Sequence, residues 1–128
     1  MSWQQAEVRT LKVGRYVIID DSPCKITGYS ASKPGKHGEA KARVEGTDIF
    51  TGQKRSFVSP VTHKIKVPMI DKRGAQVISI EGEEVQLMDL ESYEMFHVPI
   101  PEEFAESMEP GKEVQYLIAM DRKKITKV

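Results

Sequence analysis

The 128-residue sequence has one cysteine, Cys24, and no long apolar run. A lone cysteine can form neither an intramolecular disulfide nor a cysteine-based zinc site. The leader MSWQQAEVRTLK lacks the apolar core of a signal peptide, and no stretch approaches the length that spans a bilayer. We therefore expect a soluble, cytoplasmic protein that does not act at a membrane. Cys24 begins a strand-like segment and is expected to be a buried structural thiol.

Residue patterns typical of catalysis are also missing. No carboxylate pair, catalytic triad or metal-ligand cluster stands out, so we expect no catalytic residue, no metal site and no enzyme activity of its own. His63 and His97 lie at or within strand-like segments without a ligand-like partner, which favours surface or packing roles.

The formal net charge of zero hides an asymmetry between the two halves of the chain. Through Ile70 there are twelve Lys and Arg against six Asp and Glu, whereas from Asp71 onward there are seven against thirteen. Because this change occurs next to Pro68, it indicates two domains with different neighbours. We predict domains at residues 1–70 and 71–128.

Both halves are predicted to be β-structure, which makes the fold class all-β with one short helix. In the first half, short segments rich in Val, Ile and Tyr are bounded by Gly, Pro or Asp turns: YVIID, CKITGYSAS, EAKARVEGTDIF, KRSFVSP and HKIKVP. A unit of this size cannot leave long strand edges open, so a small barrel is expected.

The second half predicts three strands, a short helix and two more strands, in AQVISIEG, EVQLMDL, SYEMFHVP, IPEEFAESMEPG, KEVQYLIAM and RKKITKV. In the helical segment Pro101 suits the first helical position, and Phe104 and Met108 share a face. This order of elements is that of an OB-fold. The expected core positions are Val77, Ile80, Val85, Leu87 and Leu117.

The stretch SASKPGKHGEAKAR, residues 30–43, connects two predicted strands and is therefore expected to be the tip of a hairpin. Pro34 and Gly35 fit the central positions of a type II turn, and Gly38 adds a second permissive position. After the turn Ala40, Ala42 and Val44 alternate with charged residues. The apolar set should face the barrel, while Lys41 and Arg43 should face solvent together with Lys33.

Four interpretations of Lys36 compete. An exposed turn lysine is the default for any loop. A nucleotide-binding P-loop fails because His37 replaces the required Ser or Thr and Ser30 replaces the first glycine. A catalytic lysine would need burial, which a hairpin tip does not provide. Contact with nucleic acid fits the position and the basic surroundings, although basic residues alone are a signal of low specificity.

The motif SKPGKHGEAK, followed by VEGTDIFTGQKR, resembles the modification loop of the archaeal translation factor 5A family. This family is related to the eukaryotic factor 5A and, more distantly, to bacterial elongation factor P. The eukaryotic form has Thr where Pro34 stands and His where Glu39 stands, so the loop is similar to archaeal members. The resemblance covers nearly the whole chain, including LKVGRYVIIDDSPCKI, SPVTHKIKVP and EVQLMDLESYE.

The resemblance implies an N-terminal SH3-like barrel followed by an OB-fold, and it implies that Lys36 is the modified residue. In this family a deoxyhypusine synthase uses NAD and spermidine to transfer an aminobutyl group to that lysine, and hydroxylation can then give hypusine. No bound cofactor is implied. The modification loop would comprise Ser32, Lys33, Pro34, Gly35, His37 and Gly38 around Lys36.

The implied function is that of a translation initiation or elongation factor, monomeric when free, that binds the ribosome and promotes peptide-bond formation at stalled sequences such as polyproline. Its partners would be ribosomal RNA, peptidyl-tRNA and the synthase. The aminobutyl group would double the reach of the lysine and keep its charge, so that two cations contact phosphates at the transfer RNA acceptor end. The residues expected to bind RNA are Lys33, Lys36, His37, Lys41, Arg43, Lys54 and Arg55.

A generic tandem-barrel RNA-binding protein or RNA chaperone is the alternative function, in which Lys36 would remain unmodified. The acidic second half does not fit a simple RNA-binding barrel, because its basic residues gather near the end, at Arg122, Lys123, Lys124 and Lys127. We therefore expect the second barrel to be a shape-fitting or protein-contacting module that touches RNA at limited points.

Overall fold

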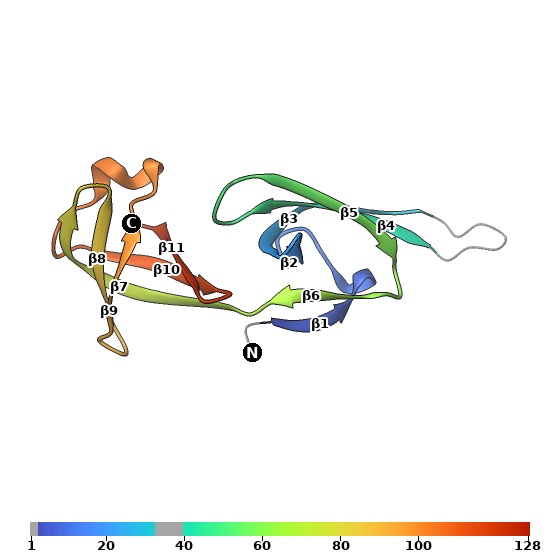
Figure 1. The fold of residues 1–128 in the computed structure, drawn as a ribbon, viewed down its shortest axis with the longest axis horizontal. Helices are drawn as coiled ribbons and strands as arrows, with labels where there is room; N and C mark the ends of the chain where they lie inside the picture. The colour runs from blue at the N-terminus through green and yellow to red at the C-terminus, as the bar shows by residue number, and fades with distance from the viewer. Residues whose placement is uncertain (1–2, 33–39) are drawn as a thin grey trace. The chain divides into compact units, whose positions relative to one another are not determined.

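The computed structural model of the chain describes residues 3–32 and 40–128. The chain divides into two compact units, Met1–Met69 and Ile70–Val128, each built almost entirely of β-strands (Figure 1). The division falls one residue before the boundary that the charge asymmetry indicates.

The first unit contains two antiparallel sheets. The larger sheet has the strand order β2-β3-β4-β5, and the smaller sheet pairs β1 with β6. A 3₁₀ turn, η1 (Val8–Thr10), joins β1 to the remainder of the unit. The strands are β1 (Trp3–Glu7), β2 (Tyr16–Ile19), β3 (Ser22–Ala31), β4 (Lys41–Asp48), β5 (Lys54–Pro60) and β6 (Lys64–Pro68).

The core of the first unit follows the period-2 pattern of its strands. Val17, Cys24, Ile26 and Val44 are at most 1% exposed and pack in one cluster. The prediction of a buried Cys24 is confirmed. Its burial raises the pKa of the thiol, and the nearby Asp48 carboxylate adds to this effect. A buried thiol of raised pKa is mostly protonated at neutral pH and is therefore a poor nucleophile.

Strand β1 was not among the predicted strands. Its sequence WQQAE has no period-2 apolar pattern, and it forms a strand by pairing with β6, from Trp3 opposite Pro68 to Glu7 opposite Lys64. The Lys66 ammonium lies over the Trp3 ring, 4.4 Å from its centroid. Long-range pairing and this cation–π contact thus override a weak local preference.

The second unit forms one sheet with the order β11-β10-β7-β8-β9, which confirms the predicted OB-fold arrangement. Lys123 of β11 lies over the ring of Phe96 of β9, with Nζ 4.8 Å from the centroid, so the two edge strands approach each other and the sheet curls towards closure. The strands are β7 (Ile70–Glu81), β8 (Glu84–Asp89), β9 (Met95–Pro99), β10 (Glu113–Ala119) and β11 (Arg122–Lys127).

The predicted helix is present, but as the 3₁₀-helix η2 (Glu102–Ser107). Pro101 is not its first helical residue: it is the N-cap, with an extended backbone at φ −60° and ψ 138°. The Phe104 N–H donates to the Pro101 carbonyl at 2.9 Å, a bond of the tight i to i+3 kind. Phe104 and Met108 both pack against the second core, as their spacing predicts.

Four of the five expected core positions of the second half are buried. Val77, Val85 and Leu87 belong to the core cluster, and Leu117 is 4% exposed. Ile80 is the exception, because 40% of its surface is exposed. The pairing of β7 with β8 shifts register between Val77 and Ser79, and Ile80 then lies opposite the buried Val85. Only one pair follows it in the ladder, so Ile80 stands near the end of the strand and stays partly uncovered.

The two units contain the same hairpin turn, built on a buried aspartate. In the first unit Oδ1 of Asp48 accepts hydrogen bonds from the N–H groups of Phe50 and Thr51, at 2.8 and 3.1 Å. In the second unit Oδ1 of Asp89 accepts the N–H groups of Glu91 and Ser92, at 2.8 and 2.9 Å. Each aspartate is at most 2% exposed, so these bonds satisfy a carboxylate that water hardly reaches.

The second of these carboxylates is also held by two side chains. Arg73 donates to both oxygens of Asp89, at 2.6 and 3.0 Å, and the Tyr116 hydroxyl donates to Oδ2 at 2.5 Å. Arg73 is the main cause that lowers the pKa of Asp89 far below its usual range. Burial, together with the bond to Asp89, raises the pKa of Tyr116 to about 12.

This pKa predicts a loss of stability at alkaline pH. The Tyr116 phenol stays neutral in the folded protein up to a higher pH than in the unfolded chain. Its contribution to the free energy of unfolding is therefore complete below about pH 10 and is lost as the pH rises through about 12. In an ultraviolet titration of tyrosinate, one of the four tyrosines should therefore ionise late.

Tyr116→Phe should remove this late phase, whereas the matched variant Tyr93→Phe, at a position that is 70% exposed, should keep it. A late phase that persists in Tyr116→Phe would assign the raised pKa to another residue.

Candidate nucleic-acid interface

The candidate site is the outer face of β3, β4 and β5 together with the segment that joins β3 to β4 (Figure 1). Lys36, the centre of the predicted modification loop, lies outside the described residues. The same is true of Lys33, Pro34, Gly35, His37 and Gly38, because the structure describes residues 3–32 and 40–128. The strands that lead into and out of this segment are described in full.

The base of the hairpin is closed at Ser32 and Lys41. The Ser32 N–H donates to the Lys41 carbonyl at 2.8 Å, and the Ser32 hydroxyl donates to the same oxygen at 3.2 Å. One step further from the tip, Ala31 pairs with Ala42 in an antiparallel ladder. The predicted pairing of these two strands is confirmed, and it brings the two ends of the Lys36 segment together.

The predicted alternation along β4 is confirmed as well. Ala42 and Val44 are fully buried, whereas Lys41, Arg43 and Glu45 are exposed. Arg43 Nε donates to Oε1 of Glu45 at 3.1 Å, and more than half of each side chain remains exposed. An exposed pair of this kind contributes about 0–1 kcal/mol, so a phosphate could replace the carboxylate at little cost.

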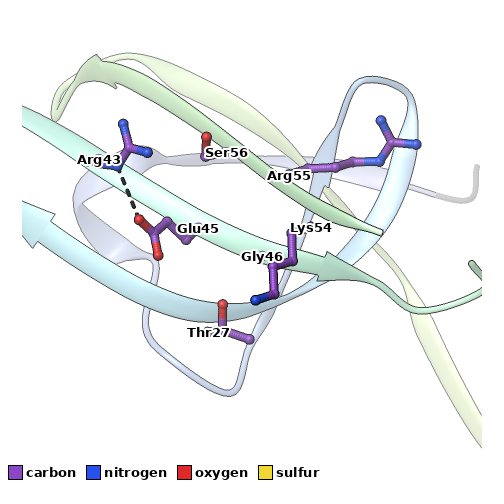
Figure 2. Close-up of a pocket in the computed structure, with 7 residues that line it drawn as sticks. All are labelled: Thr27, Arg43, Glu45, Gly46, Lys54, Arg55 and Ser56. Carbon is purple, nitrogen blue, oxygen red and sulfur yellow. Dashed lines mark hydrogen bonds and ion pairs between the residues drawn. The ribbon is translucent and has the colours of Figure 1, made fainter. Parts of the chain in front are cut away.

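A pocket of about 360 Å³ lies on this face (Figure 2). It contains the Arg43–Glu45 pair, and cations outnumber carboxylates in its wall. Thr27 lies at the register shift of β3, where the ladder with β4 skips from Ile26 to Gly28. The lining residues are Thr27, Arg43, Glu45, Gly46, Lys54, Arg55 and Ser56.

Lys54 and Arg55 are neighbours with different environments. Lys54 is exposed and pairs with Thr47, whose other neighbour across the sheet is Lys25. Since directly opposite residues share a face, Lys25 extends the basic surface, although it was not among the predicted contacts. The alternation in CKITG could have identified Lys25, because it places Cys24 and Ile26 inside and Lys25 outside.

Arg55 lies opposite Gly46, which has no side chain to compete for the space. Figure 2 shows its side chain directed away from the Arg43–Glu45 pair. Its Nε is 3.5 Å from Oδ2 of Asp48, and its Nη1 is 3.4 Å from Oδ2 of Asp20. Arg55 is therefore the counter-ion of the buried turn aspartate, and 19% of its side chain is exposed.

The pKa of Asp48 shows how this turn holds its charge. Burial alone would raise this pKa, but the N–H groups of Phe50 and Thr51, the Ser22 side chain and Arg55 together lower it below its usual value. The carboxylate thus stays ionised at neutral pH.

Residues 3–32 and 40–128 hold no group of three or more His, Cys, Asp or Glu side chains arranged to bind a metal ion. The helices among these residues are too short and too polar to cross a membrane.

The fold and the basic hairpin define the class as tandem-barrel proteins, an SH3-like unit followed by an OB-fold. A sequence model of the translation initiation factor 5A-like N-terminal domain matches residues 4–63. A second model, described as eukaryotic elongation factor 5A hypusine, DNA-binding OB fold, matches residues 69–128. The chain belongs to the translation initiation factor 5A family.

Curated members of the same family align with this chain over nearly its full length. Translation initiation factor 5A of Thermoplasma acidophilum is 56% identical over 125 residues, which is 98% of this chain and 97% of the relative. The factor of Methanothermobacter thermautotrophicus is 58% identical, over 98% of this chain and 96% of its own. These relatives are archaeal translation factors, and their names indicate no enzyme activity.

Solved structures give the same result. The factor 5A structure from Methanococcus jannaschii has a TM-score of 0.93 at 52% identity, and the comparison covers 98% of this chain and 94% of that one. A factor 5A family protein from Naegleria fowleri has a TM-score of 0.81 at 37% identity, over 99% and 98% of the two chains.

The contrast between Lys54 and Arg55 predicts different effects on stability. Arg55→Ala would leave the buried Asp48 without its counter-ion and should cost about 1–3 kcal/mol of unfolding free energy. Lys54→Ala, the matched variant on the exposed face, should change it by less than about 0.5 kcal/mol. Urea unfolding followed by Trp3 fluorescence reports on the first unit, because Trp3 is the single tryptophan and lies in β1. Equal effects of the two substitutions would contradict this role for Arg55.

Proposed function

We propose that this protein binds the ribosome and promotes peptide-bond formation at stalled sequences such as consecutive prolines, through an aminobutyl arm on Lys36. The match to a hypusine-family model makes modification of a lysine the family's property. Lys36 is the candidate because it lies in the motif SKPGKHGEAK, in the segment that joins β3 to β4.

The single observation that carries the proposal is the closed base of this hairpin. The hydrogen bonds between Ser32 and Lys41 fix where the segment leaves and re-enters the sheet. Fixing the two ends of a segment reduces the conformational entropy that the segment loses when it binds a partner. The modification itself would be made by a deoxyhypusine synthase that takes the aminobutyl group from spermidine.

In this proposal the ribosome performs the chemistry and the arm performs positioning. The arm would carry two separated cations to the acceptor end of peptidyl-tRNA, where phosphates are the natural partners. Ordering a poorly placed acceptor end removes an entropic part of the barrier to peptide transfer. The arm reaches further than the loop backbone because it extends the lysine side chain to roughly twice its length.

The basic face beside the hairpin would contact RNA phosphates. Lys41 and Lys54 are exposed, and Arg43 has only a weak surface partner in Glu45. Arg55 would add positive potential at the edge of the pocket while it remains paired with Asp48. Lys33 and His37, next to Lys36 in the sequence, are proposed to contact RNA or the synthase.

The test is a translation assay on two templates, one with and one without consecutive proline codons. Three preparations are compared: protein modified by the synthase with NAD and spermidine, unmodified protein, and Lys36→Arg treated with the same enzyme. The modified protein should accelerate the proline template by at least tenfold over the other two, because arginine cannot accept the aminobutyl group. The control template should respond to all three alike.

The alternative function predicts another outcome. If the protein is a general RNA-binding factor, charge at position 36 is sufficient, and Lys36→Arg should act as well as the wild type. Equal activity of modified protein and Lys36→Arg on the proline template would overturn the proposal. A separate ribosome-binding titration at several salt concentrations tests the basic face. The salt dependence of binding should weaken in Lys41→Ala and Arg43→Ala but not in Lys12→Ala, an exposed lysine outside this face.

A further inference from the structure

The second unit carries an apolar groove of about 550 Å³ between the end of β7, the end of β9 and η2. We name this pocket the η2 groove. The apolar residues that line it, which we call its floor, contribute aliphatic side chains and the thioether of Met108. The floor residues are Ile80, Pro99, Ile100, Ala105 and Met108. The backbone around it is well held, since the Ile100 N–H donates to the Glu83 carbonyl at 2.8 Å.

Ile80 leaves apolar surface exposed in this groove. It is 40% exposed, although β7 and β8 bury their neighbouring apolar residues Val77, Val85 and Leu87 almost completely. Ile80 lies opposite the buried Val85, in the second-last pair of the β7–β8 ladder, so it stands at the end of the strand where part of its side chain stays uncovered. A partly exposed aliphatic side chain that lines a groove is stabilised by any apolar group that covers it.

The rim of the η2 groove is acidic. Glu83, on the turn between β7 and β8, and Glu102, at the start of η2, both line it, and its lining includes no lysine or arginine. Further exposed carboxylates flank both positions in the sequence, at Glu81, Glu84, Glu103 and Glu106. One of them, Glu81, already pairs with His97 at 2.6 Å.

The negative charge of Glu83 and Glu102 distinguishes between a nucleic acid and a protein segment as the ligand of the groove. A nucleic acid would bring phosphates against this rim and be repelled, whereas a lysine- or arginine-rich protein segment would be attracted. The apolar floor requires that such a segment also present an aliphatic or aromatic side chain, because charge alone leaves Ile80 uncovered.

We propose that the η2 groove binds a basic protein segment, in which one or two apolar anchor residues enter the groove and flanking lysines or arginines meet Glu83 and Glu102. This gives the acidic unit a protein partner while the basic unit contacts RNA. The inference goes beyond the proposed function and does not depend on Lys36, so either proposal can fail without the other.

The experiment uses the full-length unmodified protein and a fluorescein-labelled synthetic peptide with two central leucines between three lysines on each side. A matched peptide carries serines in place of the leucines. Fluorescence anisotropy should show that the leucine peptide binds about tenfold more tightly than the serine peptide. Shifts of methyl signals in nuclear magnetic resonance should concentrate on Ile80, Ile100 and Met108.

Two variants of the protein test the groove itself. Ile80→Ser should weaken the leucine peptide about tenfold, whereas Ile78→Ser, at a position on the same strand that is 37% exposed and outside the groove, should not. Glu83→Gln with Glu102→Gln should also weaken binding, and more at low salt, while the matched pair Glu94→Gln with Glu113→Gln should not.

Three results would overturn the proposal. They are equal affinity for the two peptides, equal effects of Ile78→Ser and Ile80→Ser, and displacement of the leucine peptide by a twelve-nucleotide single-stranded RNA with the same methyl shifts. Equal affinity for the two peptides would mean that binding is non-specific charge attraction. Displacement by the RNA would mean that the groove binds nucleic acid. If Ile80→Ser fails to fold, the glutamate variants decide.

Discussion

The structure depends on a carboxylate buried beneath a hairpin turn, Asp48 in the first unit and Asp89 in the second. A charge removed from water is costly unless hydrogen bonds and a counter-ion replace the water. Here two backbone N–H groups of the turn donate to one oxygen, and an arginine pairs with the carboxylate, Arg55 in the first unit and Arg73 in the second. The buried charge thereby fixes both the turn and the register of the strands on either side of it.

Register in turn determines which face each functional side chain occupies. Because side chains alternate along a strand, a slip of one residue would turn Lys41 and Arg43 inward and Ala42 and Val44 outward. The Asp48 turn joins β4 to β5 and so holds the far end of β4, while the Ser32–Lys41 bonds hold the end next to the segment that contains Lys36. The basic face exists because both ends of β4 are fixed.

Much of this could be predicted from the sequence. The period-2 pattern in KARVEG predicts which β4 side chains are buried, and the order of strands and one short helix in the second half predicts the OB-fold. Arg55 shows the limit: Lys54 and Arg55 are adjacent in a strand and cannot share a face. Which of the two turns inward depends on Asp48 and on the space above Gly46, both on another strand.

Other features also arise from long-range contacts that local sequence does not encode. Strand β1 owes its conformation to β6, and Ile80 is partly exposed because it lies near the end of the β7–β8 ladder, although it pairs with the buried Val85. The helix is of the 3₁₀ type, and Pro101 caps it in an extended conformation where the sequence predicts a first helical residue. For β1 a propensity argument considers one segment, whereas the outcome depends on its partner across the sheet.

The two units divide the charge of the chain, and this division suggests a division of partners. The first unit presents cations on the sheet face of β3, β4 and β5, and the second presents carboxylates around an apolar groove. A protein that is neutral overall can in this way meet RNA with one surface and a basic protein with the other.

The central claim is that Lys36 carries the functional arm. The most direct test is the mass of the peptide that contains Lys36, from protein purified out of the organism that makes it, because a host without the synthase cannot add the group. The account predicts a mass increase of one aminobutyl group located on Lys36, with one further oxygen if the arm is hydroxylated. A fully unmodified Lys36 in growing cells would contradict it.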